Sequence, residues 1–252
     1  MNQGKPRPLA KVPEVTLGFW VIKVLATTLG ETGGDAVTMS MNLGYLIGTL
    51  IFASLFALAV WVQIRAKHFK PASYWITIIA STTVGTTLAD YADRSLGIGY
   101  AGGATLLLLL LLASLLVWHR AQGSISVETV SNPQSEMFYW LTIMFSQTLG
   151  TALGDWTADS AGLGYTGGIA IFVSLLALVL ALHVWTRTSK TTLFWVAFVL
   201  TRPLGAVVGD FLDKPLEHGG LALSRYTASL VLLVAIAVLV RVLPQHAARK
   251  AH

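Results

Sequence analysis

The sequence has no cysteine and few charged residues. The absence of cysteine excludes disulfide bonds, thiolate metal ligands and cysteine nucleophiles. Charged residues make up 12% of the 252 residues and hydrophobic residues 54%, whereas soluble domains are about 25% charged. Apolar runs such as 101–118 and 169–185 approach the length of about 20 residues that a helix needs to cross a bilayer. The composition therefore predicts a multi-pass protein of the plasma membrane, with the lipid bilayer as its partner.

The sequence also lacks the short motifs of common enzyme classes. H-E-x-x-H, G-x-S-x-G and a glycine-rich phosphate loop are all absent, so we do not expect an enzyme. The alternative is an intramembrane acid-dyad hydrolase, for which Asp90 and Asp93 would have to face each other. The net charge of +5 does not predict a nucleic-acid partner, because the basic residues flank apolar segments. The basic segment 1–13 precedes an apolar segment without a cleavage site, which favours a retained first helix over a signal peptide.

One pattern occurs four times along the chain. Each copy opens with an aromatic residue followed by tryptophan: Phe19-Trp20, Tyr74-Trp75, Tyr139-Trp140 and Phe194-Trp195. Ten residues after each tryptophan stands a glycine: Gly30, Gly85, Gly150 and Gly205. Five residues further stands an aspartate: Asp35, Asp90, Asp155 and Asp210. Nine residues beyond it stands another glycine: Gly44, Gly99, Gly164 and Gly219. This ungapped match predicts a tandem repeat of one structural unit.

The repeat predicts an all-α polytopic membrane protein. Each copy has the pattern of two apolar helices joined by a short turn, and the eight transmembrane helices are expected near 16–36, 43–64, 72–91, 98–119, 137–157, 163–186, 192–212 and 221–242. The aspartates are 55, 65 and 55 residues apart, so two pairs of hairpins are related by a shift of 120 residues. The expected organisation is an N-terminal tail (1–15), hairpins 1 and 2 (16–122), a linker (123–135), hairpins 3 and 4 (136–243) and a C-terminal tail (244–252).

The distribution of basic residues predicts the orientation in the membrane. Twelve of the seventeen lysines and arginines lie in the tails and in the loops between hairpins. The turns within hairpins hold only Arg94, Lys214 and Arg225. Because basic loops stay in the cytoplasm, we expect four parallel hairpins with both termini cytoplasmic.

The aspartates are expected inside the membrane, close to the turns. If the tryptophans mark the inner interface, the aspartate fifteen residues later lies roughly 22 Å above it, within a hydrocarbon core about 30 Å thick. Helical spacing places further polar residues on the same face: Glu31, Thr28, Thr83, Thr86, Thr148 and Thr151. Small residues four apart predict close helix packing, at Gly30 with Gly34, Gly85 with Ala89, Gly150 with Gly154, and Gly205 with Gly209.

Two basic residues fall outside the repeat pattern. Lys23 lies one turn from Trp20, so we expect its long side chain to extend to the inner interface. Arg202 lies near the expected midplane and needs a partner there, with Glu31 and Asp210 as the candidates. We therefore add Arg202 to the predicted binding residues.

These features favour a transporter or channel for a small cation. Asp35, Asp90, Asp155 and Asp210 would bind the ion as metal ligands, because carboxylate and hydroxyl oxygens suit hard ions such as Mg²⁺ or Mn²⁺. A proton-coupled cation fits the same residues, since a carboxylate can be neutralised by a proton. We expect no required cofactor, although the pattern of carboxylates allows a bound divalent cation. The alternative is a non-transporting scaffold or sensor subunit, whose aspartates cap helices or turns.

The repeated motif TLG…D…LGYxxG resembles that of a known family. It is similar to the uncharacterised bacterial membrane-anchored proteins built from a short repeat of unknown function, over roughly residues 16–242. The resemblance implies a bacterial inner-membrane location and a repeat architecture, and it implies no particular activity. The fourth copy departs most, with EHGGLALSR after its aspartate. Four copies could close a ring within one chain, and a homodimer is the other arrangement that the pattern allows.

Overall fold

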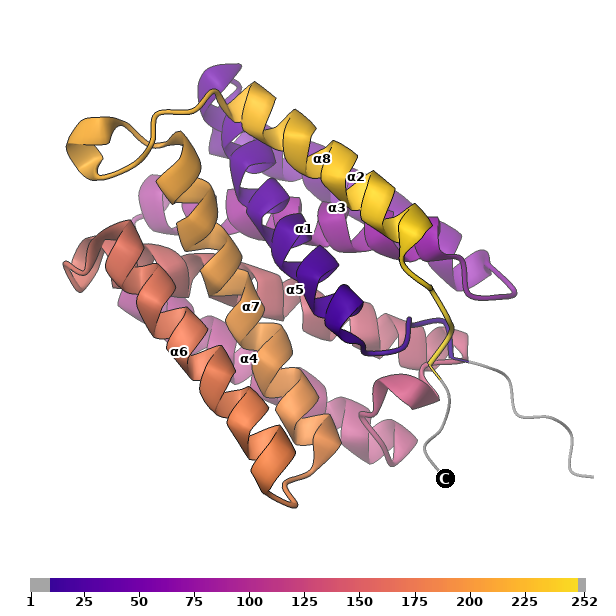
Figure 1. Ribbon diagram of the computed structural model, residues 1–252. Coiled ribbons are helices and arrows are strands. Elements are labelled where there is room, and N and C mark those ends of the chain that lie inside the picture. The colour runs from indigo at the N-terminus through magenta and orange to yellow at the C-terminus, as the bar shows by residue number, and fades with distance from the viewer. Residues whose placement is uncertain (1–9, 249–252) are drawn as a thin grey trace, which may run out of the picture.

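The computed structural model describes residues 10–248, so the predicted tails 1–15 and 244–252 lie partly outside the described residues. The described chain is all-α, as predicted, and has eight long helices (Figure 1). They are α1 (Leu17–Asp35), α2 (Gly44–Arg65), α3 (Pro71–Asp90), α4 (Tyr100–Gln122), α5 (Pro133–Asp155), α6 (Gly164–Trp185), α7 (Lys190–Asp213) and α8 (Arg225–Val242). Short 3₁₀ helices lie at Val127–Thr129 and Leu216–His218.

The first helix of each repeat forms an inner ring. Helix α1 packs on α3, α3 on α5, α5 on α7, and α7 packs on α1 to close the ring. The second helices lie outside it, and each packs on the first helix of the following repeat: α2 on α3, α4 on α5, α6 on α7 and α8 on α1 (Figure 1). A hairpin therefore spreads over two neighbouring repeats, and the ring closes within one chain.

Repeated glycines allow the inner helices to approach closely. A Cβ atom at Gly30 would lie 2.1 Å from Thr82 Oγ1, and one at Gly205 would lie 2.1 Å from Thr27 Oγ1. A Cβ atom at Gly85 would likewise clash with Gln147, and one at Gly150 would clash with Arg202. One turn later, Gly34 meets Thr86, Gly154 meets Ala206 and Gly209 meets Glu31. In each pair, the later contact involves residues further along the chain in both helices, so the inner helices run parallel.

The second repeated glycine has a different role. Gly44, Gly99 and Gly164 stand at the start of the outer helices, with φ of 75°, 77° and 63°. This left-handed backbone conformation costs little for glycine and is unfavourable for residues with a Cβ atom. In the first three repeats a five-residue π-helical turn precedes it, at Ala36–Ser40, Tyr91–Ser95 and Trp156–Ser160. The chain can thus reverse direction within a few residues.

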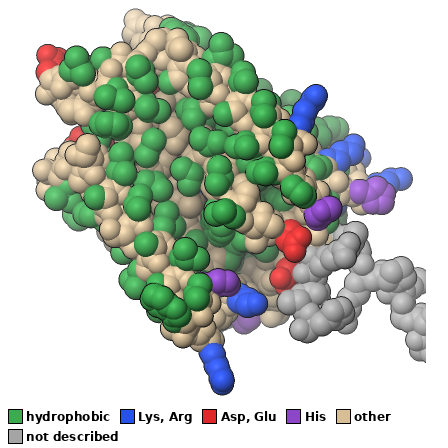
Figure 2. Space-filling view, viewed as in Figure 1, with side chains coloured by type: hydrophobic (Ala, Val, Ile, Leu, Met, Phe, Trp, Pro, Cys, Tyr) green, Lys and Arg blue, Asp and Glu red, His purple; other side chains and the backbone are tan. Residues whose placement is uncertain are grey.

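The molecule has two distinct ends. The turns within repeats lie at one end, called here the turn end. The first and last described residues lie at the other, the terminal end, where Pro13 pairs with Ala247. Among the described residues, α2, α4, α6, α7 and α8 are long and apolar enough to cross a membrane. In Figure 2 hydrophobic side chains cover the middle of the visible face, and the lysines and arginines seen there lie along its right and lower edges.

Aromatic side chains fill the ring at the terminal end. At each junction the first aromatic residue of one repeat lies near the tryptophan of a neighbouring repeat, with ring centroids 5.5 Å apart for Phe19–Trp75, 5.7 Å for Tyr74–Trp140, 6.2 Å for Tyr139–Trp195 and 5.8 Å for Phe194–Trp20. Trp75, Trp140 and Trp195 are at most 4% exposed. The expectation that the tryptophans anchor the protein at the membrane interface is therefore wrong for these three, because their rings pack against one another inside the ring.

Candidate acidic site inside the helix ring

The four repeated aspartates lie inside the ring at the turn end. Asp35, Asp90 and Asp155 are the last residues of α1, α3 and α5, and Asp210 stands in the last turn of α7. All four are almost completely buried. A buried carboxylate without a partner is costly, and the structure supplies cations from the adjacent turns.

Lys214, which directly follows α7, bridges two of these aspartates. Its ammonium nitrogen lies 2.6 Å from Asp35 Oδ2 and 3.0 Å from Asp210 Oδ1. Burial alone lowers the pKa of Lys214, but the carboxylates of Asp210 and Asp35 raise it above its ordinary value. Lys214 therefore remains a cation at physiological pH and joins the fourth repeat to the first.

Arg94 has the same role between the second and third repeats. Its Nε lies 2.9 Å from Asp90 Oδ1, and its Nη2 lies 3.7 Å from Asp155 Oδ2. Burial alone lowers the pKa of Arg94, and Asp90 and Asp155 raise it above its ordinary value. Each cation stands four residues after an aspartate, and positions 94 and 214 are related by the 120-residue shift of the duplication. That spacing is the sequence signal by which the two bridges could have been found.

A second polar layer lies about one turn deeper. Arg202 Nη2 lies 3.0 Å from Glu31 Oε2 and donates hydrogen bonds to the hydroxyl oxygens of Thr86 and Thr151. These four side chains come from α7, α1, α3 and α5, so every inner helix contributes one. Of the two partners expected for Arg202, the structure shows Glu31. The Arg202 side chain is completely buried, and its Nε and Nη1 have no hydrogen-bond partner among the described residues.

The hydroxyls of the other three expected threonines form hydrogen bonds within their own helices. The hydroxyls of Thr28, Thr83 and Thr148 donate to carbonyl oxygens one turn earlier in their own helices. They are buried but make no hydrogen bond to the described acidic groups. Their role in ion binding therefore gains no support from the geometry.

Lys23 contradicts the sequence expectation. Its side chain is fully buried and does not extend to an interface. The ammonium nitrogen lies 4.2 Å from the centroid of the Phe198 ring and 3.5 Å from Thr201 Oγ1. The lysine faces the interior of the ring because it stands on the same helical stripe as Phe19 and Glu31.

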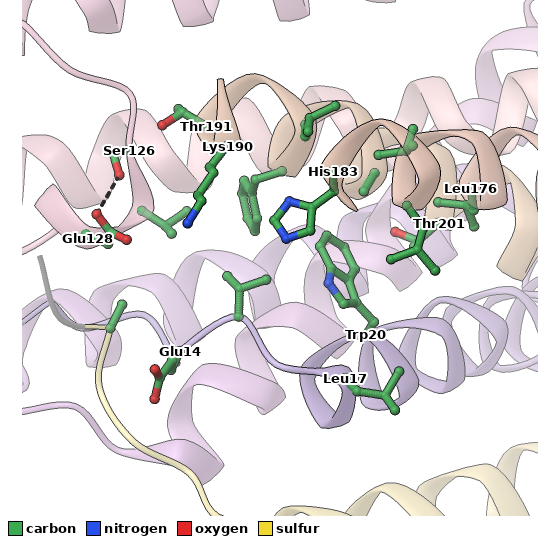
Figure 3. Close-up of a pocket in the computed structure, with 18 of the residues that line it drawn as sticks. Glu14, Leu17, Trp20, Ser126, Glu128, Leu176, His183, Lys190, Thr191 and Thr201 are labelled. Carbon is green, nitrogen blue, oxygen red and sulfur yellow. Dashed lines mark hydrogen bonds between the residues drawn. The ribbon is translucent and has the colours of Figure 1, made fainter. Parts of the chain in front are cut away.

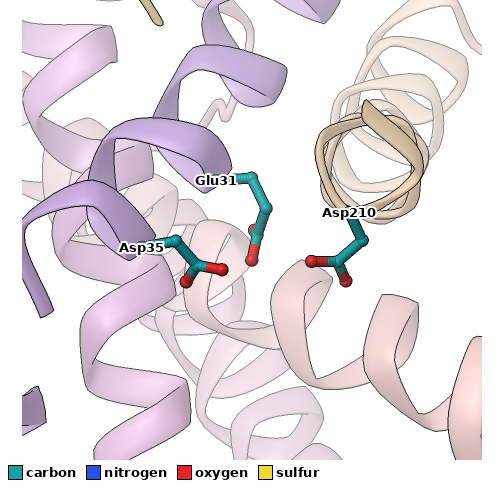
Figure 4. A group of neighbouring side chains, drawn as sticks. All are labelled: Glu31, Asp35 and Asp210. Carbon is teal, nitrogen blue, oxygen red and sulfur yellow. The ribbon is translucent and has the colours of Figure 1, made fainter. Parts of the chain in front are cut away.

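Three carboxylates converge at the junction of α1 and α7. One oxygen each of Glu31, Asp35 and Asp210 lies within 4.8 Å of the others (Figure 4). Asp35 Oδ1 is buried and has no hydrogen-bond partner within residues 10–248. Three converging carboxylates form an oxygen donor set suited to Mg²⁺ or Mn²⁺. Asp90 and Asp155 lie on the other side of the ring with Arg94, so the four aspartates form two pairs.

The charges inside the ring do not balance. Five carboxylates, those of Glu31, Asp35, Asp90, Asp155 and Asp210, face three cationic side chains, those of Arg94, Arg202 and Lys214. Asp213 and Arg225 form a further pair, with Arg225 also 3.7 Å from Asp35. Lys23, two turns below Glu31, contacts none of these carboxylates. Among the described residues, each carboxylate has a cationic neighbour, but the five carboxylates exceed the three cations by two negative charges, which favours the binding of protons or of one divalent cation.

An apolar cavity lies apart from this site. It has a volume of about 610 Å³ and lies between α1, α6 and α7 near the terminal end (Figure 3). Glu14, Glu128 and Lys190 line its polar side, and Leu176 and Thr201 line its opposite side. The five carboxylates of the acidic site are not among the residues that line it. The cavity is therefore no part of the acidic site.

Comparison with known protein families accounts for the repeat. Four segments, residues 18–69, 73–124, 138–189 and 193–243, match the family model described as a Repeat of Unknown Function (DUF347). The chain belongs to this family. The resemblance inferred from the repeated pattern is thereby confirmed, including its four copies. No curated protein and no solved structure matches the chain.

Proposed function

We propose that this protein is a membrane transporter for a small hard cation, with the ion bound by the carboxylates inside the helix ring. The observation that carries the proposal is the convergence of Glu31, Asp35 and Asp210 in a buried site with surplus negative charge. Carboxylates within the membrane are costly, and they are usually found where ions or protons pass. The Mg²⁺ or Mn²⁺ ion is the substrate in this proposal.

A carrier fits the geometry better than an open channel. The aromatic layer fills the ring at the terminal end, where the hydroxyls of Tyr74 and Tyr139 are 2.6 Å apart. At the turn end, the side chains of Lys214 and Arg94 lie between the aspartates. An ion would therefore pass only after side chains at both ends move. In this proposal all eight helices span the bacterial inner membrane, with both termini cytoplasmic because of the basic loops.

Proteoliposomes provide the test. The full chain is reconstituted, and Mn²⁺ entry is followed by quenching of an enclosed fluorophore, with an enclosed pH dye read in parallel. We expect Asp35→Asn and Asp210→Asn to reduce entry at least tenfold. Asp159→Asn is the matched control, because Asp159 is an exposed acid in a turn of the third repeat.

One observation favours the alternative of a non-transporting scaffold. The ion pairs of Lys214 and Arg94 each join neighbouring repeats, so the aspartates could serve only to close the ring. In that case Asp35→Asn would lower stability, and neither wild type nor variant would move Mn²⁺ or protons above the rate of empty liposomes.

A further inference from the structure

The two cation-bridged aspartate pairs are related by the duplication but differ in their surroundings. Lys214 lies among three carboxylates, because Glu31 joins Asp35 and Asp210 there. The residues equivalent to Glu31 beside Arg94 are Thr86 and Thr151, whose side chains carry no charge. Arg202 offsets the charge of Glu31, so each half of the ring keeps one uncompensated negative charge. The two halves differ in the number of carboxylates, because three converge at the Lys214 pair and two at Arg94.

The two cations also differ chemically. A guanidinium is planar and forms several directed hydrogen bonds, so Arg94 is suited to hold two carboxylates permanently. An ammonium is a compact charge on a flexible stem, much closer to a metal ion in shape. Asp35 accepts from Lys214 through Oδ2, and its buried Oδ1 has no hydrogen-bond partner in the part of the chain that the structure describes. The site thus holds a cation and leaves one ligand oxygen unused.

The loop that carries Lys214 differs from the other three turns. The first three repeats continue into a π-helical turn after the aspartate, whereas α7 ends at Asp213 and residues 214–224 form a longer loop with a short 3₁₀ helix at Leu216–His218. The loop folds over Lys214, whose carbonyl oxygen accepts a hydrogen bond from Ala222 N at 2.9 Å. Ala222 has φ of 52°, a left-handed conformation that is unfavourable for alanine. The loop is therefore held in a strained conformation while Lys214 is inserted.

We propose that the Lys214 ammonium is a tethered competitor for the transported ion, occupying the Glu31–Asp35–Asp210 site until the loop 214–224 withdraws it and a divalent cation binds. This inference rests on the proposed function and adds its regulation and the charge of its ion. Exchange of a single positive charge for a divalent ion also offsets one of the two unbalanced negative charges. Arg94 stays in place and keeps the other half of the ring closed.

Mn²⁺ binding to the purified full chain in detergent tests the proposal. Free Mn²⁺ is measured by electron paramagnetic resonance for wild type, Lys214→Met, Lys214→Arg and the matched control Arg94→Met. Because the tethered competitor is removed and the site is always free to bind, Lys214→Met should bind Mn²⁺ at least about tenfold more tightly than wild type. Lys214→Arg should bind Mn²⁺ at least about threefold more weakly than wild type, because a guanidinium forms directed hydrogen bonds with both aspartates. Arg94→Met should change the affinity less than about threefold.

Lys214→Arg keeps the test decisive if Lys214→Met does not fold, since it preserves the charge. Equal Mn²⁺ affinity in wild type and Lys214→Arg would overturn the inference, as would equal tightening by Arg94→Met and Lys214→Met. The proposed function would survive that result if cation or proton flux still required Asp35. Absence of both binding and flux in wild type and Lys214→Met would overturn both.

Discussion

The buried pair between Arg202 and Glu31 allows a quantitative prediction about stability. Arg202→Met removes the one cation that, among the described residues, lies within hydrogen-bond distance of the Glu31 carboxylate, whose side chain is 4% exposed. Breaking one half of a buried ion pair costs about 3–5 kcal/mol, because the remaining charge is left without compensation. The hydroxyls of Thr86 and Thr151 lose less, since both also have carbonyl acceptors in their own helices. We therefore expect Arg202→Met to lower the free energy of unfolding by about 3–5 kcal/mol.

The double variant Glu31→Gln/Arg202→Met distinguishes this cause from a general packing defect. With both charges removed, most of the loss should be recovered, so that the double variant is at least about 1 kcal/mol more stable than Arg202→Met alone. Unfolding is followed by circular dichroism during titration with sodium dodecyl sulfate in mixed micelles. Arg241→Met is the control, because Arg241 is exposed and should change stability by less than about 0.5 kcal/mol. Additive losses in the double variant would refute the reasoning.

Further predictions concern the packing of the ring. Gly205→Ala should destabilise the protein by about 1–3 kcal/mol in the same titration, because the new Cβ would lie 2.1 Å from Thr27 Oγ1; Gly102→Ala is the control, since its nearest neighbour would be 3.8 Å away. A loss at Gly102 equal to that at Gly205 would contradict the close approach of α7 and α1. Tyr74→Phe should cost about 1 kcal/mol through the lost hydrogen bond to Tyr139, and an unchanged stability would show that this bond contributes nothing.

The helices were predictable because the same pattern, two apolar segments joined by a short turn, occurs four times in the sequence. The expected helix 16–36 corresponds to Leu17–Asp35, and 163–186 corresponds to Gly164–Trp185. Larger differences occur at the starts of α5 and α8, expected at 137 and 221 and found at Pro133 and Arg225. Pro133 opens α5 after the Asn132 cap, whose side chain accepts from Ser135 N, so capping residues extended that helix beyond its apolar part.

The arrangement of the helices was less accessible from the sequence. Helical spacing correctly placed Glu31 and the aspartates on inward faces, but it does not say which neighbour a face meets. The packing of α2 on α3, and the burial of Lys23 and the tryptophans, depend on how the ring closes. The sequence places the bridging cations Arg94 and Lys214 in the turns, but their partners depend on contacts between repeats, such as that of Lys214 with Asp35.

Mn²⁺ entry into proteoliposomes that contain wild type, Asp35→Asn or Asp159→Asn tests the central claim most directly. The account predicts saturable entry with wild type and Asp159→Asn, and entry reduced at least tenfold with a folded Asp35→Asn. Equal entry through all three proteins, or none above empty liposomes, would contradict a cation site within the helix ring.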